Sequence, residues 1–359
     1  MKIISNLPAD KRTIKTNPGS YEWWYFDAIS NDNSLSFAII FYEGNPFSGN
    51  YIKGQKSDHS EFSNRAEYYP ALSISIYQYG KPVYYGFVEH KREDAHFESE
   101  SIKGKVGDSS FSGTVSGSEL IYNIELNQKL PGGDFIRASL KFSSENNFPI
   151  FPEQNIQNRE STHVWNMVQP RAGVTGKIEI DVKEKKEFIF DGTGYHDHNL
   201  GMEPMKNSFK NWYWGRFHFH DRTLIYYIMN KQGNEINNAW IIDDEFNVLP
   251  VNKKIILNDK GYNVFGLRSA RQIELTGSNH EIYIQQAGIV DDGPFYQRFL
   301  SRAVMHVNND ILQTQGISEF IAPERIYSKL FRPIVNMRIS YPDNSHWLQK
   351  KPKLFRMTW

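Results

Sequence analysis

Short runs of β-branched and aromatic residues recur along this chain at a spacing of roughly ten residues, and turn-forming clusters separate them. In the first half the runs are residues 34–42, 72–79, 83–89, 120–126 and 135–142. In the second half they are residues 176–182, 186–190, 212–219, 223–230, 239–243, 271–276 and 280–285. Gly, Asn, Asp and Pro cluster between them and mark turns. This pattern predicts an all-β chain built of antiparallel barrels or sandwiches.

The length and the turn-rich segments of the chain suggest two domains. A chain of 359 residues has room for two domains or for one large β domain. Residues 143–161 combine asparagines and prolines with little apolar periodicity, which is typical of a linker. We expect one domain in residues 1–172 and a second in residues 173–359. We also expect one short C-terminal helix at residues 323–331, which Pro333 would end.

Composition excludes several classes of protein. The 41 basic and 41 acidic residues balance, which argues against a nucleic-acid-binding groove. There are no cysteines, so disulfides and thiolate metal sites are excluded. We find neither the apolar segment of a signal peptide nor an apolar run long enough to span a membrane, and a cytoplasmic protein is the default expectation. Aromatic residues make up 14% of the chain, which suits a cavity for an apolar ligand but is also common in β-rich proteins.

The densest group of reactive side chains lies in residues 192–201, between glycines. Tyr195 and Asp197 are two positions apart, so on a strand their side chains point to the same face. His163 and Trp165 have the same spacing about thirty residues upstream. Two strands that each carry such a pair could build one pocket together.

These four residues suit acid catalysis on an alkene. Aromatic walls disfavour the charged form of a carboxylic acid, so we expect the pKa of Asp197 to rise and the acid to hold a proton near neutral pH. His163 or Tyr195 would hydrogen-bond this acid, and Trp165 would offer a π face to a carbocation. The chemistry that fits is protonation of a carbon–carbon double bond, followed by addition of water or ring closure. A buried hydrogen-bond network without catalytic function is the alternative.

His196 and His198 would lie on the face opposite Asp197. Two histidines near a carboxylate are compatible with a metal site, but the sequence has no HExxH motif and no obvious third ligand. We expect no metal, and we expect these histidines to shape the loop or to orient Asp197, and to belong to the residues that bind substrate.

Two further aromatic runs are candidates for the wall of a substrate cavity. The first contains Glu22, Trp23, Trp24 and Tyr25, and the second contains Trp212, Trp214 and Arg216. Glu22 lies among aromatic residues and needs either a partner, such as an arginine, or a substrate. Arg216 is a candidate partner for Glu22 or Asp197. Trp212 and Trp214 should share one face of a strand, with Tyr213 on the other.

Motifs for nucleotide-dependent and nucleophilic chemistry are missing from the sequence. It has no GxSxG elbow and no P-loop, and residues 192–194 lack the third glycine and the helix of a dinucleotide fingerprint. We therefore expect no cofactor.

Five motifs together resemble the hydroxyneurosporene synthase family, which are the carotenoid 1,2-hydratases and are often grouped with AttH-like proteins. They are Glu22-Trp23-Trp24-Tyr25-Phe26-Asp27, His163-Val164-Trp165, residues 192–201 followed by Glu203-Pro204, Trp212-Tyr213-Trp214-Gly215-Arg216, and Gly316-Ile317-Ser318-Glu319-Phe320. They follow the family's order and span nearly the whole chain.

The resemblance implies two consecutive lipocalin-like β domains with an apolar cavity near their junction. It implies hydration of the terminal double bond of an acyclic carotenoid without a redox cofactor, with Asp197 as the acid. Tyr195, His163 and Trp165 would support that acid. The substrate would be a small apolar polyene, carotenoid or terpenoid, which leaves peripheral access to a membrane open. After the Asp motif this chain has Asn199-Leu200-Gly201, where the family commonly has Asn-Trp-Gly or a similar bulky residue. This difference concerns the identity of the substrate more than the scaffold.

Two other functions remain open. The scaffold also resembles lipocalin-like fungal Diels–Alderases, so an intramolecular cyclase of secondary metabolism is one alternative. A non-catalytic carrier of apolar ligands is the other.

Overall fold

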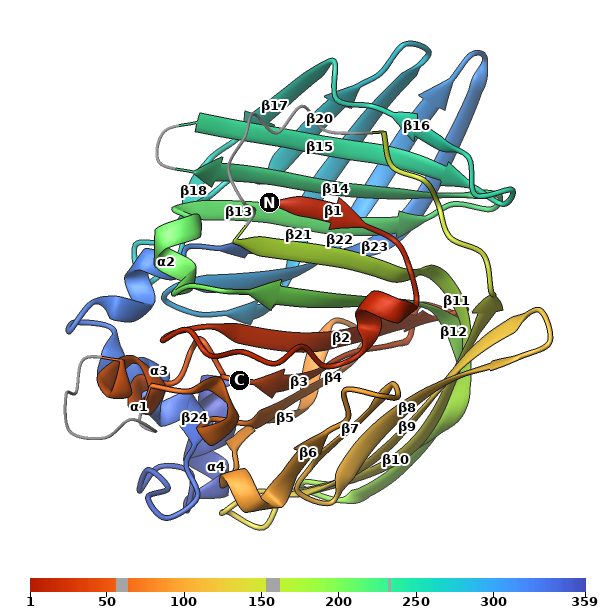
Figure 1. Ribbon diagram of the computed structural model, residues 1–359. Coiled ribbons are helices and arrows are strands. Elements are labelled where there is room, and N and C mark those ends of the chain that lie inside the picture. Colours follow the sequence, from red (N-terminus) through yellow and green to blue (C-terminus); the bar gives the residue numbers. More distant parts are fainter. Residues whose placement is uncertain (56–63, 153–161, 232–233) are drawn as a thin grey trace. The chain divides into compact units, whose positions relative to one another are not determined.

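The computed structural model describes residues 1–55, 64–152, 162–231 and 234–359. The chain is mostly β-strand, as predicted, and divides into two compact units, each with its own curled sheet (Figure 1). The first unit comprises Met1–Phe148, Glu153–Met205 and Arg332–Trp359, and the second comprises Pro149–Pro152 and Lys206–Phe331. The boundary expected between residues 172 and 173 falls inside one continuous strand of the first unit, so these units differ from the expected halves.

The first unit contains a thirteen-stranded sheet. In spatial order its strands are β24 (Ile339–Ser340), β5 (Lys81–Glu89), β4 (Ala71–Gln78), β3 (Leu35–Glu43), β2 (Tyr21–Ser30), β12 (Lys185–Gly201), β11 (His163–Asp181), β10 (Phe135–Glu145), β9 (Glu119–Lys129), β8 (Ser109–Ser116), β7 (Lys103–Val106) and β6 (Ala95–Phe97), and β1 (Lys2–Ile4) pairs with β11. The sheet curls so that strands far apart in this order meet across the core. Trp24 of β2 stacks on Phe97 of β6 with ring centroids 4.8 Å apart, and Phe41 of β3 contacts Phe111 of β8 at 5.0 Å.

Strands β11 and β12 form the longest hairpin of this sheet. The sequence predicted separate strands at residues 176–182 and 186–190, and two more that carry the His163/Trp165 and Tyr195/Asp197 pairs. The structure has two strands of 19 and 17 residues instead. The register shifts between Met167 and Gln169 and again between Gln169 and Ala172, which marks bulges. Ahead of the bulges β11 pairs in parallel with β1, and beyond them it pairs with β10. The bulged region therefore separates an end that carries His163 and Trp165 from an end that belongs to the curled wall.

The second unit contains a nine-stranded sheet and a small ribbon. The sheet order is β16 (Val248–Pro250), β15 (Asn234–Asp243), β14 (Arg222–Lys231), β13 (Asn211–His218), β23 (Asp310–Ile321), β22 (Tyr296–Val307), β21 (His280–Asp292), β20 (Gln272–Thr276) and β17 (Lys254–Asn258), and the ribbon pairs β18 (Gly261–Tyr262) with β19 (Arg268–Ser269). Tyr213 and Phe217 of β13 point into its apolar core, together with Leu224 of β14 and Phe299 of β22.

The helices of the described residues are short. The α-helices are α1 (Gly49–Gly54), α2 (Met205–Ser208), α3 (Arg332–Arg338) and α4 (Pro352–Phe355), and the 3₁₀ helices are η1 (Pro8–Asp10), η2 (Ala66–Tyr68), η3 (Arg92–Asp94), η4 (Pro323–Tyr327) and η5 (Arg356–Thr358). None of them is long and apolar enough to cross a bilayer.

The expected helix at residues 323–331 is wrong in extent. A 3₁₀ helix covers residues 323–327, and Pro333 lies in the first turn of α3 rather than after a helix end. A proline is tolerated in a first turn because the amide hydrogen that it lacks has no intrahelical partner there. In the predicted linker, residues 143–145 belong to β10, and residues 153–161 lie outside the described part of the chain.

Candidate active site

Three adjacent strands, β11, β12 and β2, position the predicted catalytic residues. Asp197 of β12 lies opposite Met167 of β11 and opposite Tyr25 of β2. Side chains alternate between the two faces of a sheet, so every second residue of these strands shares the face of Asp197. The residues of this face, which we call the acid face, are Tyr21, Trp23, Tyr25, Asp27, His163, Trp165, Tyr195, Asp197 and Asn199.

The Asp197 carboxylate is buried and accepts three hydrogen bonds. Trp165 Nε1 donates to Oδ2 over 2.7 Å, and the Tyr195 hydroxyl donates to the same oxygen over 2.8 Å. Asn199 Nδ2 donates to Oδ1 over 2.8 Å. Only 4% of the residue's surface is exposed. Three donors stabilise the ionised carboxylate, which acts against the effect of the aromatic walls that the sequence suggested.

The side-chain amide of Asn199 lies between His163 and Asp197 and links them by hydrogen bonds. His163 Nε2 lies 3.2 Å from Asn199 Oδ1, and its Nδ1 lies 3.1 Å from the Tyr21 hydroxyl. The structure therefore brings together all four residues predicted as catalytic. The contacts of Asn199 and Tyr21 were not predicted from the sequence, although Asn199 lies two positions after Asp197 and so shares its face.

A second carboxylate, Asp27, lies on the acid face next to Tyr195. Asp27 is fully buried, accepts a hydrogen bond of 2.8 Å from the Tyr25 hydroxyl and is the register partner of Tyr195. Burial, together with the charges of Asp197 and Asp27, raises the pKa of the Tyr195 phenol well above its usual range. Tyr195 thus remains protonated at neutral pH and acts as a hydrogen-bond donor.

Four residues predicted to bind substrate lie on the opposite face of the sheet. His196 stacks on Phe26 with centroids 4.0 Å apart, and His198 stacks on Trp24 at 4.6 Å. Glu22 of the same face is fully buried. His196 and His198 do lie on the face opposite Asp197, as the alternation predicted, but His196 packs on Phe26 and His198 on Trp24, in the core of the first unit rather than beside the acid. Trp23 and Tyr25 are the members of this run that share the acid face.

A buried ionic network explains how Glu22 is tolerated there. Glu22 pairs with Lys15 rather than with an arginine, and it accepts a hydrogen bond of 2.9 Å from His198 Nε2. Lys15 also pairs with Glu43. Burial works to raise the pKa of Glu22, but the charge of Lys15 and the contacts of His198 outweigh it and leave that pKa lowered. Burial works to lower the pKa of His198, but the Glu22 carboxylate outweighs it and leaves that pKa raised.

The remaining predicted residues lie on β13 of the second unit. Trp212, Trp214 and Arg216 share one face, and Tyr213 points to the other face into the core, as predicted. All three are buried. A substrate-binding role for them, and the pairing of Arg216 with an acid, stay predictions. Within the described residues, no group of three or more His, Asp or Glu side chains is arranged to hold a metal ion.

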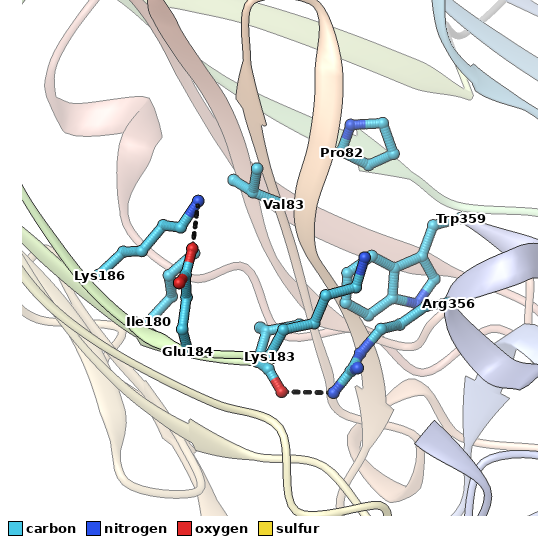
Figure 2. A pocket seen from close by; sticks show the side chains of 9 residues that line it. Pro82, Val83, Ile180, Lys183, Glu184, Lys186, Arg356 and Trp359 are labelled. Carbon is cyan, nitrogen blue, oxygen red and sulfur yellow. Dashed lines mark hydrogen bonds and ion pairs between the residues drawn. The ribbon is translucent and has the colours of Figure 1, made fainter. Parts of the chain in front are cut away.

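A surface pocket of about 210 Å³ contains no residue of the acid face in its lining, and Figure 2 shows it from close by. It is formed where the β11–β12 hairpin turns and is lined by Pro82, Val83, Ile180, Val182, Lys183, Glu184, Lys186, Arg356 and Trp359. Asp197 lies towards the other end of the hairpin and does not line it. This pocket therefore has no part in the chemistry considered for Asp197.

The chain is similar in sequence to carotenoid hydratases. The family model described as carotenoid hydratase CrtC matches residues 50–350. A Chlorobaculum tepidum protein named hydroxyneurosporene dehydrogenase is 28% identical, and the match covers 90% of this chain and 87% of the relative. An acyclic carotenoid 1,2-hydratase of Thiocapsa roseopersicina is 24% identical, with 86% of this chain and 72% of the relative covered. The quinolone epoxide rearrangement protein asqO of Emericella nidulans is 24% identical, with 66% and 62% covered.

Solved structures share the fold at low sequence identity. An AttH protein of Nitrosomonas europaea superposes with a TM-score of 0.60 and 11% identity, and the match covers 89% of this chain and 99% of that chain. CghA bound to Sch210972 gives a TM-score of 0.57 and 12% identity, with 89% and 96% covered. These neighbours support the lipocalin-like architecture expected from the sequence.

Proposed function

The chain belongs to the carotenoid hydratase CrtC family, and from this premise we propose that it adds water to the terminal double bond of a long acyclic polyene. The substrate class is an acyclic carotenoid or a related isoprenoid. The reaction joins an alkene and water to give a tertiary alcohol, so it is balanced without an electron carrier.

Asp197 is the proton donor in this proposal. Its protonated carboxyl transfers a proton to the terminal alkene and leaves a tertiary carbocation. Alkenes are weak bases, so the acid must become a stable anion as the proton leaves. The donors Trp165 and Tyr195 at Oδ2, and Asn199 at Oδ1, stabilise that anion. This set of three buried donors around one carboxylate is the observation that carries the proposal.

The other groups of the acid face serve the cation and the water. The Trp165 ring lies next to the acid and offers its π face to the cation, which contributes up to about 2 kcal/mol in a dry site. Both ring nitrogens of His163 are already hydrogen-bonded, to Tyr21 and to Asn199, so His163 supports the acid through Asn199, and the water that captures the cation enters beside the carboxylate. The carboxylate of Asp197 takes the proton that this water loses, which restores the starting state.

The second candidate function is an intramolecular rearrangement or cyclisation. Its support is the similarity to the quinolone epoxide rearrangement protein over 66% of this chain. The same acid would start it by protonating an epoxide or an alkene, and a neighbouring π bond would then replace water as the nucleophile.

Heavy-oxygen water separates these functions. The purified protein is incubated with vesicles that contain an acyclic carotenoid, in water enriched in oxygen-18, and the products are analysed by mass spectrometry. Hydration predicts a product heavier by one labelled water, and heat-unfolded protein serves as the control. A product of unchanged mass would support cyclisation, and recovery of unaltered, bound carotenoid at all protein concentrations would support a carrier and contradict hydration.

A further inference from the structure

A chain of four buried side chains ends at Oδ1 of Asp197, whereas Trp165 and Tyr195 donate to Oδ2. The Tyr21 hydroxyl lies 3.1 Å from His163 Nδ1, and His163 Nε2 lies 3.2 Å from Asn199 Oδ1. Asn199 Nδ2 then donates to Asp197 Oδ1 over 2.8 Å. All four residues are at most 5% exposed, so water does not compete for these contacts.

The chemistry of the four groups fixes the direction of every hydrogen bond in this chain. Because Asn199 turns its amide nitrogen to Asp197, it turns its carbonyl oxygen, which can only accept, to His163. A neutral His163 must therefore carry its hydrogen on Nε2, and its Nδ1 is then an acceptor. The Tyr21 hydroxyl donates to that acceptor. A donor at Nδ1 favours this tautomer of His163, so the phenol at one end supports the orientation of the amide at the other end.

The orientation of the Asn199 amide decides what happens to the Asp197 proton. Oδ2 is occupied by Trp165 and Tyr195, so the transferable proton of the acid form belongs on Oδ1. An amide that presents NH₂ to Oδ1 cannot accept this proton, which stays available to the substrate. An amide turned over would present its carbonyl oxygen, accept the hydrogen bond from the acid and hold the proton away from the alkene.

We propose that Tyr21 and Asn199 are positioning residues which, through the tautomer of His163, keep a hydrogen-bond donor aimed at Asp197 and so leave its proton free for transfer. This inference rests on the proposed function of Asp197 as the acid. It assigns His163 a role in setting the orientation of Asn199.

Tyr21→Phe is the informative substitution, because it keeps the ring and removes the donor to His163. Without that donor, His163 is free to place its hydrogen on Nδ1, and Nε2 then accepts from an overturned Asn199. We expect kcat to fall about tenfold, the size expected for one lost hydrogen bond, with KM little changed. The alkaline limb of the pH profile of kcat should move to higher pH, because the acid holds its proton more tightly.

A double-variant cycle separates this role from a general effect on folding. Asn199→Ala removes the link itself, so Tyr21→Phe should cause no further loss of kcat in that background. Tyr84→Phe is the matched control. Tyr84 is also a fully buried tyrosine of the same sheet, and it donates to Gln128. We expect Tyr84→Phe to change kcat little. In the double variant, its fold-change in kcat should simply multiply that of Asn199→Ala. A Tyr21→Phe protein that is folded and has the wild-type kcat and pH profile would overturn the proposal, as would multiplying losses for Tyr21 and Asn199.

A second measurement tests the proposal without any catalysis. Nitrogen-15 NMR distinguishes the two neutral histidine tautomers, and the His163 signals are identified as those missing from His163→Gln. We expect the Nε2–H tautomer in the wild type and the Nδ1–H tautomer in Tyr21→Phe. The Nδ1–H tautomer in the wild type, or no change in the variant, would refute the tautomer mechanism whether or not the protein proves to be a hydratase. A hydratase assay that fails while the tautomer changes as expected would instead refute the proposed function.

Discussion

At Asp197, burial and hydrogen bonding act on one carboxyl group in opposite directions. Burial disfavours the charge, whereas the donors Trp165, Tyr195 and Asn199 favour it. A general acid for an alkene needs both effects, because it must keep a proton until the substrate arrives and must then release it to a weak base. The sequence predicted that His163 and Trp165 share one face of a strand, and that Tyr195 and Asp197 do so too, because an i, i+2 spacing is a local signal. The hydrogen bonds that link Asp197 through Asn199 and His163 to Tyr21 could not be predicted, because they depend on the register between strands far apart in the sequence.

Glu89 at the end of β5 provides a test of electrostatics at the residue scale. Burial raises the pKa of its carboxyl from 4.5 to about 7, although hydrogen bonds from Ser48 and Asn50 act to lower it. The folded protein therefore binds a proton that the unfolded chain has lost between these values, so this group makes the free energy of unfolding fall as pH rises from 4.5 to about 7.

We expect Glu89→Gln to raise the free energy of unfolding at pH 8 by up to about 3 kcal/mol and to change it little at pH 4, where Glu89 is protonated. Denaturant titrations at the two pH values measure this difference. Glu93→Gln, at an exposed position nearby, is the control and should have little effect at either pH. Equal stabilities of Glu89→Gln and wild type at pH 8 would contradict the burial of a charged Glu89.

At the scale of elements, the central strands β2, β11 and β12 keep two different chemistries apart. One face carries the acid and its donors, and the other carries the ionic network of Glu22, Lys15 and His198. The alternation that separates the faces was predictable from the sequence, as the placement of His196 and His198 shows. The length of β11 and β12 was not, because the bulges after Met167 interrupt the local pattern that a single strand would show.

Gly201 at the end of β12 tests how strictly these strands position Tyr21. A Cβ at Gly201 would lie 2.1 Å from Tyr21 Cζ, so an alanine must displace the Tyr21 ring. We expect Gly201→Ala to lower the free energy of unfolding by about 1–3 kcal/mol and to lower kcat as Tyr21→Phe does. Gly173→Ala on β11 is the control, because the nearest atom that a Cβ there would meet among the described residues is Ser143 O, at 3.8 Å. Thermal unfolding and hydration assays check both variants, and a Gly201→Ala protein with wild-type stability and kcat would show that the ring is not held in place.

At the scale of the whole molecule, the first unit is built from three separate stretches of the chain. Arg332–Trp359 returns to it after the second unit, and β24 pairs with β5 to become the edge strand of the sheet. In this segment Arg356 also pairs with Asp134. The all-β class was predictable, because strand periodicity and turn residues are local signals. The return of the C-terminal segment was not, because a two-residue strand that pairs with residues about 250 positions earlier leaves no periodic pattern in the sequence.

The proposed hydration depends on proton transfer from Asp197. Asp197→Asn keeps the size of the side chain and removes the acid, so its turnover of an acyclic carotenoid is the most direct test. We expect kcat to fall by about 100-fold to 10,000-fold, the usual contribution of a general acid, while carotenoid binding and the unfolding temperature stay near those of the wild type. Asp191→Asn, at an exposed position on the same strand, should retain full activity. An Asp197→Asn protein that hydrates the carotenoid at the wild-type rate would contradict proton donation by Asp197.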